Sequence, residues 1–396
     1  MRRFVKLILI ALVLSVGAAA WGQAAAGDSL TIGLLMVGPY NDHGWSEANY
    51  DGVQYVLDKV PGTKMVYVDK VNPADRPGTT ASQLAESLVA QGAKLVIFSS
   101  DDMSDEAVKF ATAHPDIFVI FTSGDTTWKD GKNFKDLPNM VCIMGKMVYM
   151  KMVAGVAAAM TTKTGKIGFL GPLVNDETRR LASSAYLGAR YAWVHYRHMN
   201  AAKLQFKVTW IGYWFNIPGV TSDPTQVADD FFNSGYDVVI SGIDTTEAVA
   251  EASKYQAKGQ KVWAIPYDYS KAIDEGKSVA LGVPYFNWGP AYATASKAAM
   301  AGTWQSHFEW NLPDWKNIND PDKSAVGFNK GTLSKAASAT VDRFVGELGK
   351  GLNLWKGPLE LQDGTVYLTD GQAATDKEIW YLPQLLKGME GQSVSK

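Results

Sequence analysis

The sequence predicts an α/β protein of two Rossmann-like lobes with parallel sheets joined by a hinge. Short apolar runs alternate with segments of helical periodicity along most of the chain, which is typical of a doubly wound parallel sheet. The chain has 396 residues, which is more than one ordinary hydrophobic core accommodates. A ligand pocket is expected in the cleft between two such lobes.

The first lobe is expected within residues 27–146. Its strands are continuous runs of aliphatic and aromatic residues without polar alternation, as in strands that helices cover on both faces. The predicted strands cover residues 30–37, 64–68, 95–98 and 118–121. The predicted helices cover residues 45–60, 79–91 and 103–114.

The second lobe is expected within residues 147–283, where the same alternation of strand and helix patterns begins again. This repetition of the pattern predicts a second parallel sheet. The predicted strands cover residues 165–170, 206–213, 238–241, 262–266 and 279–283. The predicted helices cover residues 147–160, 178–195, 225–233 and 247–257.

The remaining segment, residues 284–396, is expected to return through the hinge and to pack on the lobes. It contains a predicted helix at 291–300, followed by three tryptophans among Asn, Pro and Asp residues. A small hairpin with short helices is expected within residues 357–391.

The N-terminus has the layout of a secretory signal peptide, which we predict over residues 1–26. A basic start precedes an apolar run and two groups of small residues at cleavage spacing. The apolar run is shorter than the roughly 20 residues that span a membrane, although an uncleaved anchor is the alternative. No cysteine stands directly after the predicted signal peptide, where a lipid would be attached, so we expect a periplasmic protein without a lipid anchor.

Composition argues against several classes of partner and site. The formal net charge is -2 and no long basic stretch occurs, so neither nucleic acid nor an anionic membrane is an expected partner. Cys142 is the one cysteine, which excludes an intrachain disulfide and a thiolate metal site. His195 and His198 share a helix face, but no third metal ligand is evident, so no metal and no cofactor are expected.

Candidate ligand-binding residues of the first lobe follow its predicted strands. Asp42, His43 and Trp45 come after the first strand, Asn49 lies one turn further along the helix, and Ser123 follows the fourth strand. Ligands in such sheets bind beyond the carboxyl ends of the strands, so these residues are expected at the cleft. The alternatives are that Asp42 caps the helix and that Trp45 belongs to the core.

Candidate residues of the second lobe occupy the matching positions. Trp214 follows the strand at 206–213, Asp244 and Asp268 follow the next two strands, and Asn287 and Trp288 are expected at the hinge. The carboxylates can accept hydrogen bonds from N–H or O–H groups of a ligand. Helix capping is the alternative for Asp244, because a capping arrangement follows it.

One indole ring from each lobe, Trp45 and Trp214, can hold a flat ligand between them. Stacking on a base contributes roughly 1–3 kcal/mol per ring. A sugar also stacks on tryptophan, so stacking alone leaves the ligand open. Metalloprotease, nucleophile-elbow and phosphate-loop patterns do not occur in the sequence, and we expect no enzymatic activity.

Several motifs in order resemble the basic membrane protein (BMP) family, substrate-binding proteins of ABC importers that include purine nucleoside receptors. Residues 42–45, Asp-His-Gly-Trp, resemble the first-loop motif of that family, with Gly52 in the following helix. Residues 162–170 resemble the strand that opens its second lobe, and residues 186–192 resemble the next helix. The resemblance covers nearly all of the mature chain.

The resemblance implies a type I periplasmic binding fold that closes on its ligand, a monomer, and ABC permease subunits in the membrane as partners. It places Trp214 where the family stacks a base and Asp268 where a ribose-binding aspartate is usual. Asn287 and Trp288 replace a ribose-contacting lysine, and Leu181 replaces an aromatic residue. Residues 286–290 and 355–358 resemble a branch linked to free purine bases. These features favour a purine base or a similar flat heterocycle over a nucleoside.

Two other functions fit the same sequence. An exported nucleoside hydrolase would need a positioned base, for which Asp42 is the one tempting candidate. A ligand-sensing receptor of the same fold would pass its signal to a membrane kinase.

Overall fold

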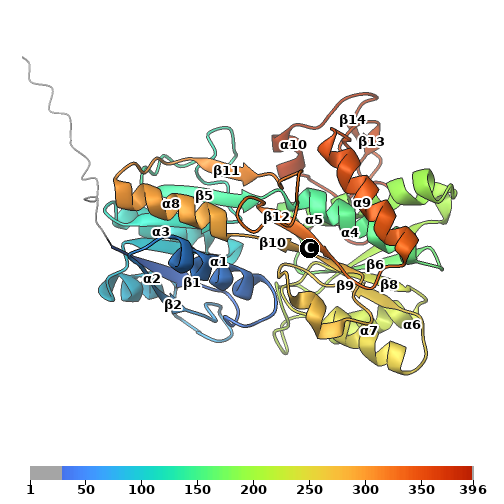
Figure 1. Ribbon diagram of the computed structural model, residues 1–396, viewed down its shortest axis with the longest axis horizontal. Helices are drawn as coiled ribbons and strands as arrows, with labels where there is room; N and C mark the ends of the chain where they lie inside the picture. Colours follow the sequence, from blue (N-terminus) through green and yellow to red (C-terminus); the bar gives the residue numbers. More distant parts are fainter. Residues whose placement is uncertain (1–28, 395–396) are drawn as a thin grey trace, which may run out of the picture.

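The computed structural model describes residues 29–394 as two α/β lobes that lie side by side (Figure 1). The signal peptide predicted at residues 1–26 lies outside the described residues. None of the helices within residues 29–394 is long and apolar enough to cross a membrane.

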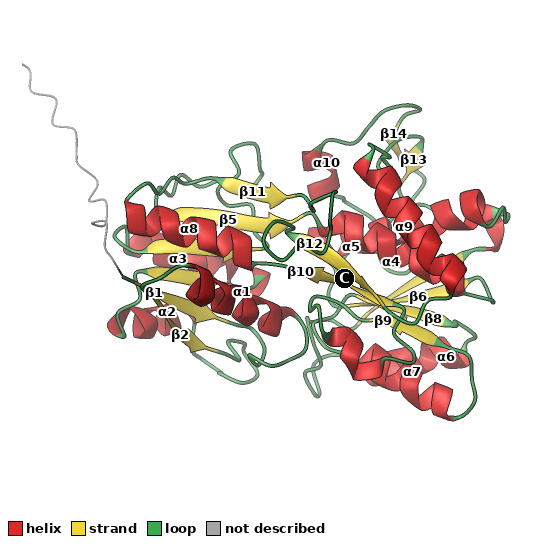
Figure 2. Ribbon diagram, viewed as in Figure 1, coloured by secondary structure: helices red, strands yellow, loops and turns green. Residues whose placement is uncertain are grey.

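The first lobe is a parallel sheet of six strands in the order β11-β5-β4-β3-β1-β2. The strands are β1 (Leu30–Leu35), β2 (Thr63–Val68), β3 (Leu95–Phe98), β4 (Phe118–Thr122), β5 (Met140–Gly145) and β11 (Phe308–Asn311). The helices are α1 (Trp45–Lys59), α2 (Ala81–Ala90), α3 (Ser104–Ala113) and α8 (Gly289–Ala301). The helices α1 and α8 pack together on one face of this sheet, and α2 and α3 cover the other (Figure 2).

The second lobe is a parallel sheet of five strands in the order β15-β7-β6-β8-β9. The strands are β6 (Lys166–Gly171), β7 (Gln205–Trp210), β8 (Val238–Ser241), β9 (Trp263–Ile265) and β15 (Met389–Glu390). The helices are α4 (Met147–Thr161), α5 (Asp176–Tyr191), α6 (Pro224–Asn233), α7 (Glu247–Ala257) and α9 (Lys335–Gly349). A π-helical turn at Ala192–Tyr196 continues α5.

Small residues let α4 and α5 pack backbone against backbone. A Cβ atom on Gly155 would lie 1.9 Å from the carbonyl oxygen of Ala185, and one on Gly188 would lie 2.0 Å from that of Met152. Only glycine allows so close an approach. The Ala-rich sequence of α4 is buried along nearly its whole length and places Lys151 beneath the cleft.

The chain crosses between the lobes three times, from β5 to α4, from β10 (Gly282–Phe286) to α8, and from β11 to β12 (Val326–Lys330). The strands β10 and β12 pair antiparallel where these crossings run. Residues 284–396 therefore serve both lobes, because α8 and β11 return to the first and α9 packs on α4 of the second. The end forms β13 (Leu359–Glu360), β14 (Val366–Leu368) and α10 (Asp376–Trp380) before β15.

The predicted fold class, two parallel α/β lobes, is confirmed. Some elements differ from the sequence-based expectation. The strand predicted at 279–283 is wrong in position, because β10 covers Gly282–Phe286 and pairs with β12. The sequence reading assigned no strand to β5, β11 or β12 and no helix to α9.

Candidate functional site

A cavity lies between the lobes, beyond the carboxyl ends of strands from both sheets. The first lobe contributes four wall residues that follow β1, β3 and β4, namely Trp45, Ser100, Asp101 and Ser123. The second lobe contributes residues from β6 and α5 and from positions after β6, β7, β8 and β9, namely Phe169, Pro172, Glu177, Thr178, Leu181, Trp214, Gly242, Asp244 and Tyr267. The two sheets thus converge on one site at their carboxyl ends.

Trp45 is the first residue of α1 and is held firmly in the wall. Its side chain is 7% exposed, and its indole N–H donates to the carbonyl oxygen of Ser99. Its ring meets Phe286 and Trp288 edge-on, with centroids 5.2 and 5.4 Å away. Trp288 stacks on Phe286 at 4.8 Å. Trp288 therefore supports Trp45 from behind and is not itself a wall residue.

Trp214 faces the same cavity from the loop after β7. Its carbonyl oxygen accepts a hydrogen bond of 3.0 Å from the main-chain N–H of Asp244. Asp244 follows β8, so this bond ties together two wall residues that are 30 positions apart in sequence. Ser123 closes the opposite wall after β4 with a left-handed backbone, φ 68°. Four of the ten expected residues therefore line one cavity: Trp45, Ser123, Trp214 and Asp244.

Asp42 and His43 lie just outside the wall. The Asp42 carboxylate accepts hydrogen bonds from the main-chain N–H groups of Gly44, Ser46 and Glu47 at 2.9–3.0 Å, so it caps the start of α1. Burial raises the pKa of Asp42 to about 6. His43 is exposed, and its main-chain N–H donates to the Glu47 carboxylate at 2.9 Å.

Asn49 and Asn287 hold the scaffold around the cavity. The Asn49 amide donates to the carbonyl oxygen of the first residue of α1 at 2.9 Å and accepts from the Tyr292 hydroxyl at 2.5 Å, which fastens α1 to α8. The Asn287 amide donates to the carbonyl oxygens of Pro321 and Ser324 at 3.0 and 2.7 Å. Asn287 thereby fixes the crossing between β10 and β12, and neither asparagine lines the cavity.

Asp268 lies behind the wall with an unusual environment. It is fully buried, its backbone is left-handed at φ 70°, and neither carboxylate oxygen has a hydrogen-bond partner among the described residues. Burial raises its pKa well above the usual range, although the Lys151 ammonium acts in the opposite direction. A buried carboxylate without a partner is costly in the ligand-free protein.

Burial also raises the pKa of three carboxyl groups in the wall itself. The pKa rises to about 6 for Asp101 and to about 7 for Glu177. It rises well above the usual range for Asp244, first through burial and then through the neighbouring charges of Asp268 and Asp42. The cavity is therefore an acidic site in which ionisation is unfavourable without a ligand.

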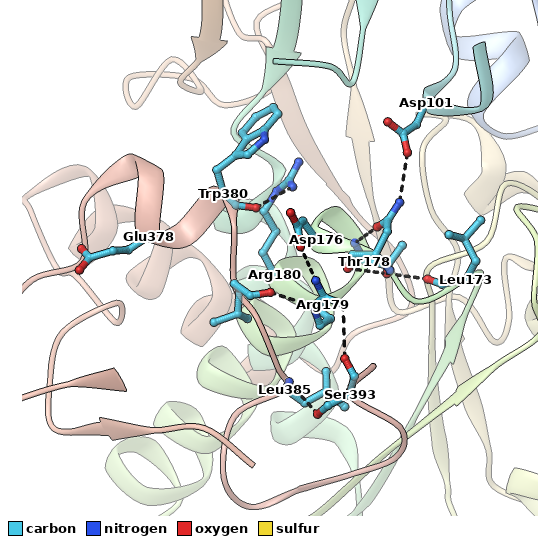
Figure 3. Close-up of polar contacts among 12 residues, drawn as sticks. Asp101, Leu173, Asp176, Thr178, Arg179, Arg180, Glu378, Trp380, Leu385 and Ser393 are labelled. Atoms are coloured by element: carbon cyan, nitrogen blue, oxygen red, sulfur yellow. Dashed lines mark hydrogen bonds and ion pairs between the residues drawn. The ribbon is translucent and has the colours of Figure 1, made fainter. Parts of the chain in front are cut away.

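Two buried cations lie near these carboxyl groups without lining the cavity, and the charge of each lowers the pKa of Glu177. The Lys151 ammonium donates to the carbonyl oxygen of Ser241 at 2.8 Å and lies 3.1 Å from the centroid of the Tyr267 ring. The Arg180 guanidinium lies 4.2 Å from the centroid of the Trp380 ring and donates to the Trp380 carbonyl oxygen at 3.3 Å. Figure 3 shows this arginine reaching from α5 to the C-terminal segment.

The lobes touch each other around the cavity. The backbone of Gly44 presses on Asp244, since a Cβ atom on Gly44 would lie 1.6 Å from the Asp244 carbonyl oxygen. The Tyr213 hydroxyl of the second lobe donates to the Asp102 carboxylate of the first at 2.8 Å. These contacts describe a closed arrangement of the two lobes.

The start of α5 contributes Glu177 and Thr178 to the wall, and Figure 3 shows this part of the helix between Asp101 of the first lobe and the C-terminal segment. Asn175 caps the helix by accepting from the main-chain N–H of Thr178, and its amide also donates to the Asp101 carboxylate at 3.3 Å. A polar chamber of about 810 Å³ adjoins the cavity here and shares Asp101, Ser123 and Glu177 with it. Its remaining lining comes from the loop after β4, from α5 and from the C-terminal segment, including Arg179, Arg180, Trp380 and Tyr381.

Sequence reasoning did not select nine of the wall residues, among them Asp101, Glu177, Leu181 and Tyr267. Asp101 stands among acidic residues at a helix start, a pattern that also fits helix capping. Tyr267 precedes Asp268 directly and follows a predicted strand, which is the signal that could have found it. For Glu177, the signal was the cap at Asn175, which marks a helix start directed at the cleft.

Comparisons with known proteins agree with this architecture. A family described as ABC transporter substrate-binding protein, PnrA-like (Bmp), matches residues 29–312. The chain belongs to this family. It is therefore an extracytoplasmic solute-binding protein of an ABC transporter and not an enzyme, as the sequence motifs predicted.

Three individual relatives are similar to this chain. A purine-binding protein of Brucella abortus (strain 2308) is 28% identical over 360 residues, which cover 90% of this chain and 92% of that one. A nucleoside-binding protein of an ABC transporter from Lactococcus lactis is 29% identical and covers 58% of this chain and 59% of its own. A Haloferax volcanii protein assigned to glucose binding in an ABC transporter is 24% identical, with 77% and 72% covered.

The fold has solved counterparts. The crystal structure of a solute-binding protein of an ABC transporter system from Aeropyrum pernix K1 superposes with a TM-score of 0.60 at 14% identity, covering 81% of this chain and 85% of that one. At this identity the likeness supports the two-lobed fold alone.

Proposed function

We propose that the cleft captures a purine base, or a similar flat heterocycle, for import by an ABC permease. One observation carries the proposal: Trp45 from the first lobe and Trp214 from the second line the same cavity. A flat ring held between two indoles gains roughly 1–3 kcal/mol from each stacking contact. Leu181 and Phe169 add apolar wall that suits a ring rather than a sugar alone.

Lobe closure is the proposed mechanism of capture. In the open form Trp214 and Asp244 move away with the second lobe, while Trp45 stays with the first. The ligand fills the space between them, and closure restores the contacts of Gly44 with Asp244 and of Tyr213 with Asp102. The permease then recognises the closed form. We place this cycle in a periplasm, with the protein acting as a monomer.

A nucleoside is the second candidate, and the polar chamber beside the cavity favours it. The chamber shares Asp101, Ser123 and Glu177 with the cavity, so a sugar attached to a stacked base could extend into it. The base remains the first choice, because Trp45, Trp214, Phe169 and Leu181 give the cavity an apolar wall that suits a flat ring.

Calorimetric titration of the purified protein with purine bases, purine nucleosides and hexoses tests the proposal. We expect a purine base to bind, and Trp45→Ala and Trp214→Ala each to weaken it at least tenfold, or about 1.4 kcal/mol. Trp315→Ala is the matched control, since Trp315 packs on Tyr149 outside the cavity wall. Unchanged affinity in both cavity variants, or binding of hexoses alone, would refute the proposal.

A further inference from the structure

The hydrogen-bond donors of the cavity wall are largely engaged by the protein itself. The indole N–H of Trp45 and the hydroxyl groups of Ser123 and Thr178 each donate to a main-chain carbonyl oxygen, those of Ser99, Thr122 and Leu173 respectively. The donors that remain are neutral: the hydroxyl groups of Ser100 and Tyr267 and the indole N–H of Trp214. The wall therefore has few groups that could bind an acceptor-rich or anionic ligand.

The acceptors of the wall are largely free. The carboxylates of Glu177 and Asp244 form no hydrogen bond and no ion pair with any residue in the range 29–394, although their residues are 8% and 5% exposed. The Asp101 carboxylate accepts one hydrogen bond, from Asn175 at 3.3 Å. Carboxylates hidden from water without partners are costly, so they provide a driving force for a ligand that donates hydrogen bonds.

No positively charged side chain offsets these carboxylates within the wall. The residues that line the cavity include three acidic groups and no Lys, Arg or His. The two buried cations nearby, Lys151 and Arg180, lie outside the wall and donate to the carbonyl oxygens of Ser241 and Trp380. Ligand N–H groups therefore find acceptors in the wall, whereas a ligand anion finds no cationic side chain there.

We propose that this cavity selects heterocycles by their N–H donors, binding amino-substituted purines and rejecting purines that carry a negative charge. The inference rests on the proposed function, since it assumes that the flat ligand is a purine. Glu177 and Asp244 act as the specificity-determining acceptors, because both line the cavity from the same lobe and their carboxyl oxygens have no hydrogen-bond partner among the described residues. Hydrogen bonds from ligand N–H groups would give these carboxyl oxygens the partners that the protein does not supply.

Two purines of similar shape test the proposal, because one is a neutral molecule rich in N–H donors and the other carries a negative charge. Calorimetric titration at pH 8 compares 2,6-diaminopurine, which is rich in N–H donors, with urate, which is an anion. We expect 2,6-diaminopurine to bind at least 100-fold more tightly than urate. Equal or tighter binding of urate would overturn the inference and leave the proposed function intact. Failure of every purine, with a hexose bound instead, would overturn both.

Variants of single wall residues test whether Glu177 and Asp244 determine the preference for 2,6-diaminopurine over urate. Glu177→Gln removes a charge and introduces a donor, so we expect it to narrow the preference for 2,6-diaminopurine over urate at least tenfold. Asp176→Asn is the matched control, because it removes the same charge one residue away and outside the cavity wall. An unchanged ratio in Glu177→Gln, or an equal change in Asp176→Asn, would contradict the assignment. If Glu177→Gln fails to fold, the ratio of the affinities for 2,6-diaminopurine and urate is compared between Asp244→Asn and wild type instead.

Discussion

The two aromatic walls of the cleft differ in how they are held. Trp45 is 7% exposed, its indole N–H donates a hydrogen bond, and the rings of Phe286 and Trp288 pack against it. Trp214 stands on a loop, is partly exposed, and within residues 29–394 its side chain forms no hydrogen bond and no ring contact. One half of the clamp is therefore built into the core of its lobe before the ligand arrives. The other half, Trp214, packs against the core but has no hydrogen bond or ring contact of this kind among the described residues.

The largest expected effect is a difference in folding stability between the variants of Trp45 and Trp214. Trp45→Ala removes a buried indole, so we expect the free energy of unfolding of the ligand-free protein to fall by about 3–5 kcal/mol. Trp214→Ala should cost clearly less, because its side chain is partly in water without a ligand. Urea unfolding of both variants measures the difference. Equal losses would mean that the two walls are held alike.

The next effect tests closure itself. Gly44→Ala places a Cβ atom 1.6 Å from the Asp244 carbonyl oxygen, so the lobes could not reach the closed arrangement. We expect ligand affinity to fall at least 100-fold, or about 2.8 kcal/mol, while the ligand-free protein remains folded. Gly346→Ala on α9 is the control, since a Cβ there meets nothing within 4 Å. Wild-type affinity in Gly44→Ala would show that this contact is not needed.

The smallest effect concerns pH and the acidic wall of the second lobe. Burial raises the pKa of Glu177 to about 7, above its value of 4.5 in a model compound, so the folded protein binds more protons than the unfolded chain between those values. Stability of the ligand-free protein should therefore rise as pH falls from 7 to 5. Melting temperatures should show a flatter slope in Glu177→Gln than in wild type. Identical slopes would remove Glu177 from this account.

The buried strands were predicted well, because in a doubly wound sheet a continuous apolar run indicates a strand that helices cover on both faces. Both β3 (Leu95–Phe98) and β8 (Val238–Ser241) have the bounds that were predicted. The strands β11 and β12 could not be found in the same way, because their pairing depends on partners far away in sequence. The shift of β10 has the same cause. The helix α9 did carry a local signal, since Ser334 caps it, so this miss was avoidable.

The site was predictable only in part. Trp45, Ser123, Trp214 and Asp244 line the cavity because residues after parallel strands meet at one edge. Asp42 occupies an equivalent position, yet its carboxylate turns back to cap α1, and sequence pattern cannot distinguish these two roles. On α5, Glu177 carried a local signal in the helix cap at Asn175, whereas the place of Leu181 in the wall depends on how the two lobes meet.

A crystal structure of the protein with 2,6-diaminopurine tests the central claim most directly. We predict a ring lying parallel to the indoles of Trp45 and Trp214, at about 3.5–4.0 Å from each. Its N–H groups should face Glu177 and Asp244. A ligand bound outside this cavity, or one that touches Trp45 while Trp214 points into solvent, would contradict the account.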